Sequence, residues 1–141
     1  MELALKRAQD KNETFSLLLF DLDDFKKVND TYGHECGDLI LKMAASTISR
    51  GVKASDYVFR WGGEEILVLL KGNKTTAVRA AERIRFDIER QVVEYKGQMI
   101  KITSTVGVAS YDDKKTARDL FALADENLYI GKNSGKNCVI S

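Results

Sequence analysis

Acidic side chains gather at two places in the sequence. Asp21, Asp23 and Asp24 follow an apolar run, and Glu64-Glu65 follows a pair of glycines. If the two segments are neighbours at the centre of a sheet, both acidic groups emerge at the same edge. Two carboxylates and a strand-end carbonyl then form a hard oxygen site that suits Mg²⁺, with its other positions left for water and substrate phosphates. The alternative is that these acids are simply solvated at a strand end and a turn.

Other kinds of metal site are excluded by spacing. Counted from Asp21, an EF-hand calcium loop would need an oxygen ligand where Phe25 stands and a bidentate Glu where Tyr32 stands. The two cysteines, Cys36 and Cys138, form no CxxC motif and no Cys/His pair with metal-ligand spacing. We expect both to be reduced thiols.

Apolar patterning predicts the elements that must position the acids. The run FSLLLF at 15–20 is too short for a helix and indicates a buried strand. Strands are also expected at 57–61 and 66–70, around Gly62-Gly63, whose positive backbone angles would make a tight hairpin turn. The same reasoning gives the remaining elements: helices at 1–9, 25–32, 75–88 and 116–130, a helix capped by Asp38 and ended by Gly51, strands at 92–95 and 99–108 around Lys96-Gly97, and an edge strand at 138–140.

The order of these elements predicts a fold class. Strands outnumber helices, and hairpins interrupt the alternation of strand and helix, so a mixed or antiparallel sheet fits better than a doubly wound parallel one. The prediction is an α+β fold: a ferredoxin-like or palm-type sandwich in which helices flank a central, mostly antiparallel sheet with a Gly-Gly-Glu-Glu hairpin.

Composition excludes several classes of protein. The 141 residues fit one domain. The 22 basic and 21 acidic side chains give a net charge of +1, which argues against a polynucleotide binder, a class that is usually strongly basic. No apolar run approaches the roughly 18 residues of a membrane span, and residues 1–12 lack the apolar core of a signal peptide. We therefore expect a cytoplasmic domain.

Three ordered motifs make the chain resemble a known family. RWGGEEI at 60–66 is similar to the GG(D/E)EF signature of the GGDEF family, the diguanylate cyclases. FDLDDFKKVNDTYGHECGD at 20–38 resembles the family's D-x-D-x-F-K-x-x-N-D-x-x-G-H-x-x-G-D segment, and ADENLYIGKNSGKN at 124–137 resembles its closing A-D-x-x-L-Y-x-x-K-x-x-G-x-N. ITSTVGVA at 102–109 is similar to the family's penultimate core strand. The resemblance runs from about residue 15 to residue 139.

The resemblance implies an activity and a metal. Family members condense two GTP molecules into cyclic di-GMP and two pyrophosphates. Two subunits face each other as a homodimer, so that each 3′-hydroxyl attacks the α-phosphate of the other nucleotide. The implied metal is Mg²⁺, with Mn²⁺ as a substitute, held by Asp21, Glu64 and the backbone carbonyl of Leu22. Glu64 and Glu65 are the implied catalytic carboxylates, with Glu65 as the candidate base for the 3′-hydroxyl.

The resemblance also implies how GTP is bound. Asn29 and Asp38 would recognise guanine, because a carboxylate accepts from N1–H and the exocyclic amine together, whereas adenine would leave it unpaired. The alternative is that Asp38 only caps a helix. The triphosphate would lie against the start of a helix, whose free amides favour anions, and against the basic loop KNSGK at 132–136. The alternative is that this loop is only a solvated basic segment, which is the more common case for such a sequence taken alone. The implied phosphate-binding residues are Asp23, Asp24, Phe25, Lys26, Lys132 and Lys136.

Departures from the family pattern change what is expected. Lys53 and Asp56 stand where the family has its inhibitory R-x-x-D, which binds product. Lys53 cannot form the planar fork of Arg, so this degenerate inhibitory site should give weak or absent product inhibition. The family's opening D-x-L-T-G-L-x-N-R segment is missing. We expect residues 1–141 to be a single domain from a larger protein, whose N-terminal sensor or dimerisation domain pairs two copies and which could be membrane-anchored.

Other functions stay open at this point. A catalytically silent GTP-binding or regulatory module of the same fold would carry the same motifs without turnover, although the retained metal, guanine and phosphate residues speak against decay. Another palm-type nucleotidyl transferase, such as the polymerase-like palm of CRISPR effectors, also carries a Gly-Gly-acid hairpin. A purely structural α+β domain would explain the periodicities but not the three ordered motifs.

Overall fold

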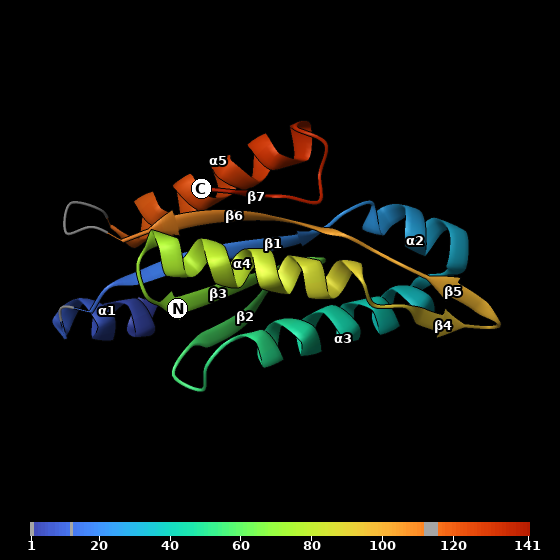
Figure 1. Cartoon of the computed structure of the whole chain (residues 1–141), viewed down its shortest axis with the longest axis horizontal. Helices are drawn as coiled ribbons and strands as arrows, with labels where there is room; N and C mark the ends of the chain where they lie inside the picture. The colour runs from blue at the N-terminus through green and yellow to red at the C-terminus, as the bar shows by residue number, and fades with distance from the viewer. Residues whose placement is uncertain (1, 12, 112–115) are drawn as a thin grey trace.

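The computed structural model describes residues 2–11, 13–111 and 116–141 (Figure 1). Within these ranges no helix is long and apolar enough to cross a membrane. The helices are α1 (Glu2–Asp10), α2 (Phe25–Tyr32), α3 (His34–Gly51), α4 (Lys74–Glu89) and α5 (Ala117–Asn133). The strands are β1 (Phe15–Leu22), β2 (Tyr57–Gly62), β3 (Glu65–Lys71), β4 (Val93–Tyr95), β5 (Gln98–Ile100), β6 (Ser104–Ser110) and β7 (Val139–Ile140).

Most of the strands form one sheet, in the order β2-β3-β1-β6-β7, while β4 and β5 pair in a separate hairpin. Each pairing in the large sheet is antiparallel except that of β6 with β7. The predicted α+β fold with a mostly antiparallel sheet flanked by helices is therefore confirmed. The strand expected at 138–140 is the edge strand β7.

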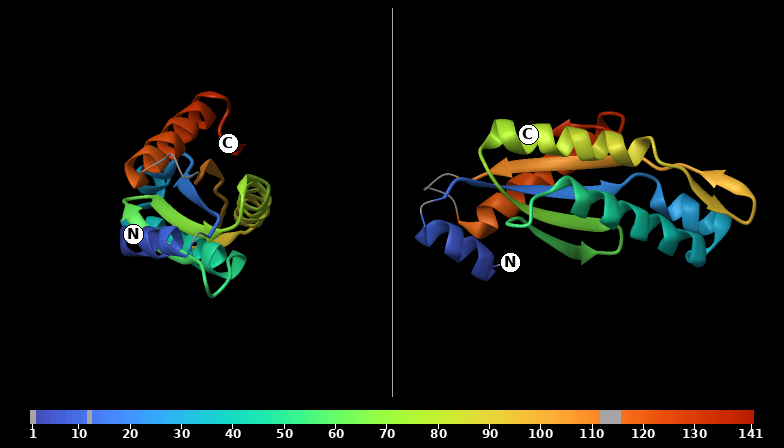
Figure 2. Two further views of the ribbon diagram at one scale, coloured as in Figure 1. Left: turned by 90° about the vertical axis from the view of Figure 1, so that its left-hand side faces the viewer. Right: turned by 60° about the horizontal axis from the view of Figure 1, so that its bottom comes forward.

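Helices cover both faces of the sheet (Figure 2). Alternate residues of β1 point to opposite faces. Leu18 and Phe20 pack with residues of α2, α3 and α4 in one core, whereas Leu17 and Leu19 pack with residues of α1 and α5 in the other. All four side chains are buried. A central strand covered on both faces needs apolar side chains on both, which is why residues 17–20 are all apolar and show no alternation.

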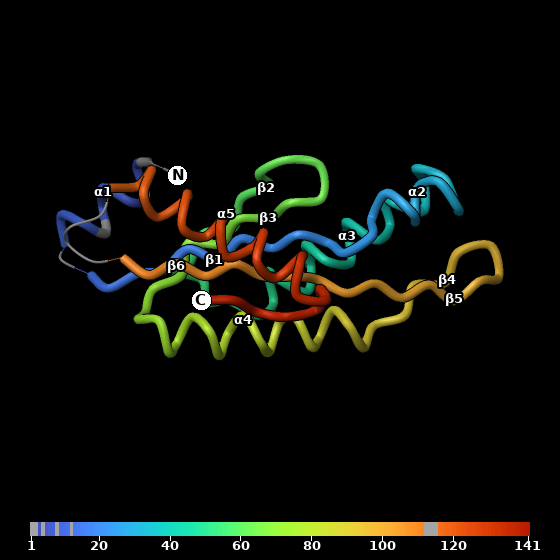
Figure 3. Tube along the Cα trace, turned by 90° about the horizontal axis from the view of Figure 1, so that it is seen from above, coloured from blue at the N-terminus to red at the C-terminus, as the bar shows by residue number. Residues whose placement is uncertain are grey.

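The two ends of the molecule differ. Figure 3 shows α2 and the β4–β5 hairpin together at one end and α1 at the other. β1 runs from the α1 end toward α2, so its acidic carboxyl end points toward the α2 end. Asp21 lies within this strand, and Asp24 lies between the strand and the first turn of α2.

The prediction that Asp38 caps a helix is wrong. α3 begins at His34, directly after Gly33, whose φ of 94° permits a sharp break from α2. Asp38 therefore lies inside α3. The first turn of α3 is mostly polar and contributes Cys36 and Gly37 to the buried residues, so the apolar periodicity starts about one turn later than the helix does.

The strand predicted at 99–108 is wrong in part, because it is interrupted. β5 ends at Ile100 and β6 begins at Ser104. Between them, Thr103 accepts a hydrogen bond from the Asp23 amide (2.9 Å) and donates its hydroxyl to the Asp23 carboxylate (2.7 Å). These bonds extend the contact between β1 and β6 past the Leu22–Ser104 pair, while β5 pairs with β4 in the separate hairpin. Ile100 and Ile102 are both buried, so the apolar pattern gives no sign of the break.

The positive backbone angles predicted at Gly62-Gly63 are also wrong. Neither glycine has a positive φ, and β2 continues through Gly62 with a register irregularity after Arg60. The turn consists of Gly63 and Glu64, and Arg60 Nη2 donates to the Gly63 carbonyl (3.2 Å). The hairpin itself lies where the sequence predicts it.

Candidate active site

The register of the sheet brings the two acidic segments together. Asp21 on β1 is paired with Glu65 on β3. The amide of Leu22 donates to the carbonyl of Glu64, at 3.4 Å. The predicted metal and catalytic residues therefore share one edge of the sheet, although β1 and the hairpin are far apart in the sequence.

Burial and like charges raise the proton affinity of this edge. Burial raises the pKa of Asp21 to about 6; Lys132 opposes this shift, and Glu64 and Glu65 add to it. Burial also raises the pKa of Glu65, with further contributions from Asp125 and Glu64. Lys132 Nζ lies 3.4 Å from Asp21 Oδ1, but its charge does not outweigh the effect of burial on the pKa of Asp21. Three carboxylates, those of Asp21, Glu64 and Glu65, therefore lie close enough to influence one another at this edge.

This donor set fits a divalent cation. Across the described ranges no three His, Cys, Asp or Glu side chains are grouped as a metal site, so a cation here would need the Leu22 carbonyl beside Asp21 and Glu64. Carboxylate and carbonyl oxygens suit Mg²⁺, which keeps positions for water and phosphate. A bound cation would also favour the ionised form of Asp21, against the burial that raises its pKa.

Two lysines reach the acidic edge from the carboxyl end of α5. Lys132 Nζ contacts Asp23 Oδ1 at 2.6 Å and the backbone carbonyl of Asp21 at 3.4 Å. Lys136 Nζ contacts Asp24 Oδ1 at 2.6 Å, and this hydrogen bond raises the pKa of the exposed lysine. The structure thus brings both lysines of the KNSGK loop region to the start of α2.

Asp23 makes contacts that differ from the predicted ones. Its amide donates to the carbonyl of Thr103, so this amide is already used and is not offered to a phosphate. Its carboxylate accepts from Thr103, Thr105, Lys132 and the amide of Asn137. Burial raises the pKa of Asp23, but the hydrogen bonds from Lys132, Thr105 and Thr103 outweigh burial, and the pKa is lowered. Asp23 therefore holds the β1–α2 junction together as an anion.

The remaining predicted phosphate residues lie where α2 begins. Asp24 precedes the helix and has an αL backbone with φ of 55°, and its side chain does not cap the helix. Phe25 is buried in the core, while Lys26 is exposed in the first turn. The amino end of a helix favours anions, so this turn remains the predicted phosphate position.

The two predicted guanine residues come from different helices that touch each other. Asn29 on α2 packs against Gly37 on α3: a Cβ at position 37 would lie 3.0 Å from Asn29 Cγ and closer still to its oxygen. Because Gly37 has no side chain, Asn29 can pack against α3 at the position next to Asp38. Asp38 lines a cavity of about 370 Å³ between α3 and the β2–β3 hairpin, walled also by Leu41, Lys42, Ala45, Val58, Arg60 and Ile66.

Sequence reasoning missed some of the residues at this site. Lys42 and Arg60 bring positive charge to the cavity beside Asp38. Asp125 on α5 acts on Glu65 electrostatically. The sequence contains cues to two of these residues. Lys42 follows Asp38 by one helical turn, and Asp125 is the acid of the A-D motif at 124–125.

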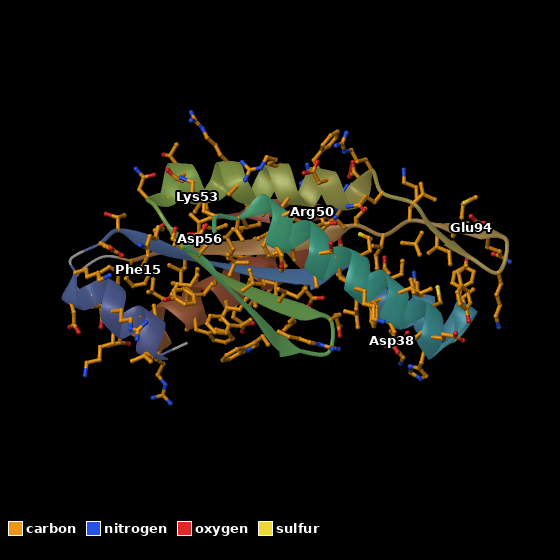
Figure 4. All side chains as sticks on the ribbon, turned by 90° about the horizontal axis from the view of Figure 1, so that it is seen from below. Phe15, Asp38, Arg50, Lys53, Asp56 and Glu94 are labelled. Carbon is orange, nitrogen blue, oxygen red and sulfur yellow. The ribbon has the colours of Figure 1, made fainter. Side chains whose placement is uncertain are left out.

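The predicted inhibitory segment lies at the other end of α3 from Asp38. Figure 4 shows Lys53 and Asp56 near Arg50, away from Asp38. Both carboxylate oxygens of Asp56 accept from backbone amides, those of Lys53 and Lys71, each at 2.9 Å. Asp56 therefore organises the entry into β2. Beside it is a cavity of about 230 Å³ whose basic lining residues are Lys53, Lys71, Arg79 and Arg83.

Product binding at this segment provides a test of the predicted degeneracy. We expect the chain to bind cyclic di-GMP more weakly than submicromolar, because Lys53 lacks a bidentate fork. Lys53→Arg should tighten this binding about tenfold, since Arg forms two parallel charge-assisted hydrogen bonds where Lys acts as a point charge. Isothermal titration calorimetry measures both values, with Lys74→Arg as the control. Submicromolar binding by the unsubstituted chain would contradict the prediction.

Comparison with known sequences identifies the family. A family model described as "Diguanylate cyclase, GGDEF domain" matches residues 1–138. Diguanylate cyclase A of Treponema denticola is 41% identical over 132 residues, which cover 92% of this chain and 36% of that protein. Diguanylate cyclase DosC of Escherichia coli K12 is 40% identical over 126 residues, 88% of this chain and 27% of that protein. The chain thus spans less than half the length of these relatives.

Solved structures with the same fold point to the same family. The GGDEF domain of DgcB from Caulobacter crescentus, in complex with c-di-GMP, has a TM-score of 0.93 and 27% identity, covering 99% of this chain and 84% of that chain. The active GGEEF domain of a diguanylate cyclase from Vibrio cholerae has a TM-score of 0.90 and 28% identity, covering 99% and 89%. Both the sequence motifs and the sheet that carries them agree with these relatives, and the chain belongs to the GGDEF family of diguanylate cyclase domains.

Proposed function

We propose that the chain is the catalytic domain of a diguanylate cyclase that condenses two GTP molecules into cyclic di-GMP and two pyrophosphates. One observation carries the proposal: Asp21 meets Glu64 and Glu65 at a sheet edge that Lys132 also reaches. Nucleotidyl transfer at an α-phosphate requires oxygen ligands for a divalent cation and positive charge for the phosphates, and this edge has both. The relatives named for this activity support it.

Different residues of the chain would bind the metal ion and accept the proton at the reacting centre. Asp21, Glu64 and the Leu22 carbonyl would hold Mg²⁺ or Mn²⁺, which when bound neutralises phosphate charge and orients the α-phosphate. Glu65 would accept the proton of the attacking 3′-hydroxyl. Its pKa, raised by burial, brings it nearer to neutral pH, where a general base works best.

The substrate would be held at its two ends. We assign the cavity beside Asp38 to guanine. Asn29, which packs against Gly37 next to Asp38, would be the second recognition residue. The phosphates would lie at the start of α2, near Lys26, Lys132 and Lys136. ATP would leave the Asp38 carboxylate without its two donors, which is the basis of selectivity for GTP.

Two copies of the domain would be needed for turnover. Each copy offers one guanine cavity, and the attacking hydroxyl belongs to the nucleotide of the other copy. We therefore propose that a homodimer is the active form and that a neighbouring N-terminal domain of a longer protein brings the copies together. SiaD of Pseudomonas aeruginosa, of which this chain covers 52% with a TM-score of 0.90 and 32% identity, was solved with its activator SiaC, in line with control from outside the domain.

A direct assay tests this function. The chain at high concentration, and the chain fused to a dimerising coiled coil, are incubated with GTP and Mg²⁺, and cyclic di-GMP is measured by chromatography. We expect product from the fused dimer with GTP and none with ATP. GTP binding without product from the fused dimer would favour a silent GTP-binding module. Absence of GTP binding would overturn both functions.

A further inference from the structure

The loop that follows α5 is joined to two distant parts of the chain through Asn137. Its backbone amide donates to Asp23 Oδ2 at 2.9 Å. Its side-chain oxygen accepts from Arg85 Nη1 on α4 at 2.7 Å, and its side-chain amide donates to Glu89 on the same helix. Asn137 therefore connects the β1–α2 junction, the loop after α5 and helix α4.

The backbone of this loop needs such a connection. Gly135, Lys136 and Asn137 have φ values of 109°, 62° and 47° in succession. A left-handed backbone is unfavourable for a non-glycine residue, although Asn tolerates it better than most. The Lys136 amide is held by the carbonyl of Gly131 (3.1 Å), and the Lys136 side chain reaches Asp24 from this fixed backbone.

The partners on α4 are themselves fixed, and they select an amide at position 137. Arg85 is only 15% exposed and forms ion pairs with Glu82 (3.1 Å) and Glu89 (3.3 Å). The donor Arg85 faces the oxygen of Asn137, and the acceptor Glu89 faces its nitrogen. A carboxylate at this position would meet a second carboxylate at Glu89, so only a side chain with both a donor and an acceptor satisfies the two partners.

We propose that Asn137 is a positioning residue for the triphosphate: it fixes the loop from which Lys136, and through Asp23 also Lys132, face the phosphates. The inference rests on the proposed function and adds to it a link to α4 outside the predicted ligand contacts. A lysine side chain is long and flexible, so its reach depends on where its backbone is held. Positioning of this kind is lost when the anchoring contacts are lost, even though both lysines remain.

The variant Asn137→Gly tests the link to α4 without disturbing the left-handed backbone of the loop. Glycine adopts a φ of 47° without penalty, but it removes both side-chain bonds. With Mg²⁺ present, we expect the Kd of GTP to rise about tenfold and the Kd of guanosine to change by less than about twofold, because guanosine carries no phosphate. Asn133→Ala is the matched control: this exposed residue of the last turn of α5 donates to the Tyr129 carbonyl (2.9 Å), and we expect both Kd values to stay unchanged.

Exchanging the amide and the carboxylate between positions 137 and 89 provides a test by rescue of GTP binding. Asn137→Asp should weaken GTP binding by placing two carboxylates together, and adding Glu89→Gln should restore binding to within about threefold, because donor and acceptor are then exchanged. Equal weakening of GTP and guanosine, unchanged GTP binding in Asn137→Gly, or no rescue would each overturn the inference. A wild-type chain that binds no GTP at all would instead overturn the proposed function, and the inference with it.

Discussion

Replacement of Glu64 by Gln is expected to lower the rate of cyclic di-GMP formation by the dimerised chain at least about a hundredfold, which corresponds to roughly 3 kcal/mol of lost transition-state stabilisation. Gln keeps the volume of the side chain but removes the negative charge that a divalent cation needs. Glu64 lies in the turn beside Asp21, and the other proposed ligands are only one carboxylate and one carbonyl. The loss of one charge from so small a donor set cannot be compensated locally.

A matched control separates this effect from a general loss of charge. Glu94 lies on β4 in the separate β4–β5 hairpin, outside the sheet that carries Asp21 and Glu64, and its side chain is exposed. Glu94→Gln makes the same chemical change and should leave the rate within about twofold, as surface substitutions generally do. The rate is measured with saturating GTP and Mg²⁺, and circular dichroism checks the fold. Full activity of Glu64→Gln would refute the metal assignment.

Replacement of Gly107 by Ala is expected to destabilise the domain by about 3 kcal/mol or more, because the added methyl group meets backbone rather than a flexible side chain. Gly107 lies on β6 under α5. A Cβ there would lie 2.6 Å from the Leu128 nitrogen and closer still to the Ala124 carbonyl oxygen. α5 would have to move away from the sheet, and the Ala124 and Leu128 side chains, both buried, would lose their packing.

Urea unfolding followed by circular dichroism measures this loss. The control is Gly62→Ala, since a Cβ at Gly62 would meet nothing within 4 Å and its φ is not positive. We expect the control to change the free energy of unfolding by less than about 1 kcal/mol. Domains are stable by only about 5–15 kcal/mol, so the Gly107 variant should show a clearly lower urea midpoint or fail to fold. An unchanged midpoint would mean that α5 lies farther from β6 than described.

Much of the fold could be predicted because its causes are local. The unbroken apolar run of β1 reflects a strand covered on both faces, and the apolar spacing of α4 and α5 reflects one buried stripe on each helix. The acidic segments at the end of β1 and after Gly62-Gly63 indicate a shared edge, and the β1–β3 register places them side by side. Residue type and spacing carry this information without any knowledge of the packing.

The family, the kind of sheet and the choice of Asp21, Glu64 and Glu65 as candidates for chemistry could all be read from the sequence. The packed structure was needed to show that Asp38 lies inside α3 and that the strand expected at 99–108 is interrupted. It was also needed to show that the Asp23 carboxylate accepts from Thr103, from β6, from α5 and from the loop after α5. The two kinds of information differ in the sequence separation over which the interactions act. Periodicity and turn chemistry act between residues a few positions apart, whereas the partner of a buried polar group depends on which distant segments pack against it. Asn137 illustrates this difference: its motif position is visible in the sequence, but its link to Arg85 and Glu89 exists only once α4 and α5 are packed on the sheet.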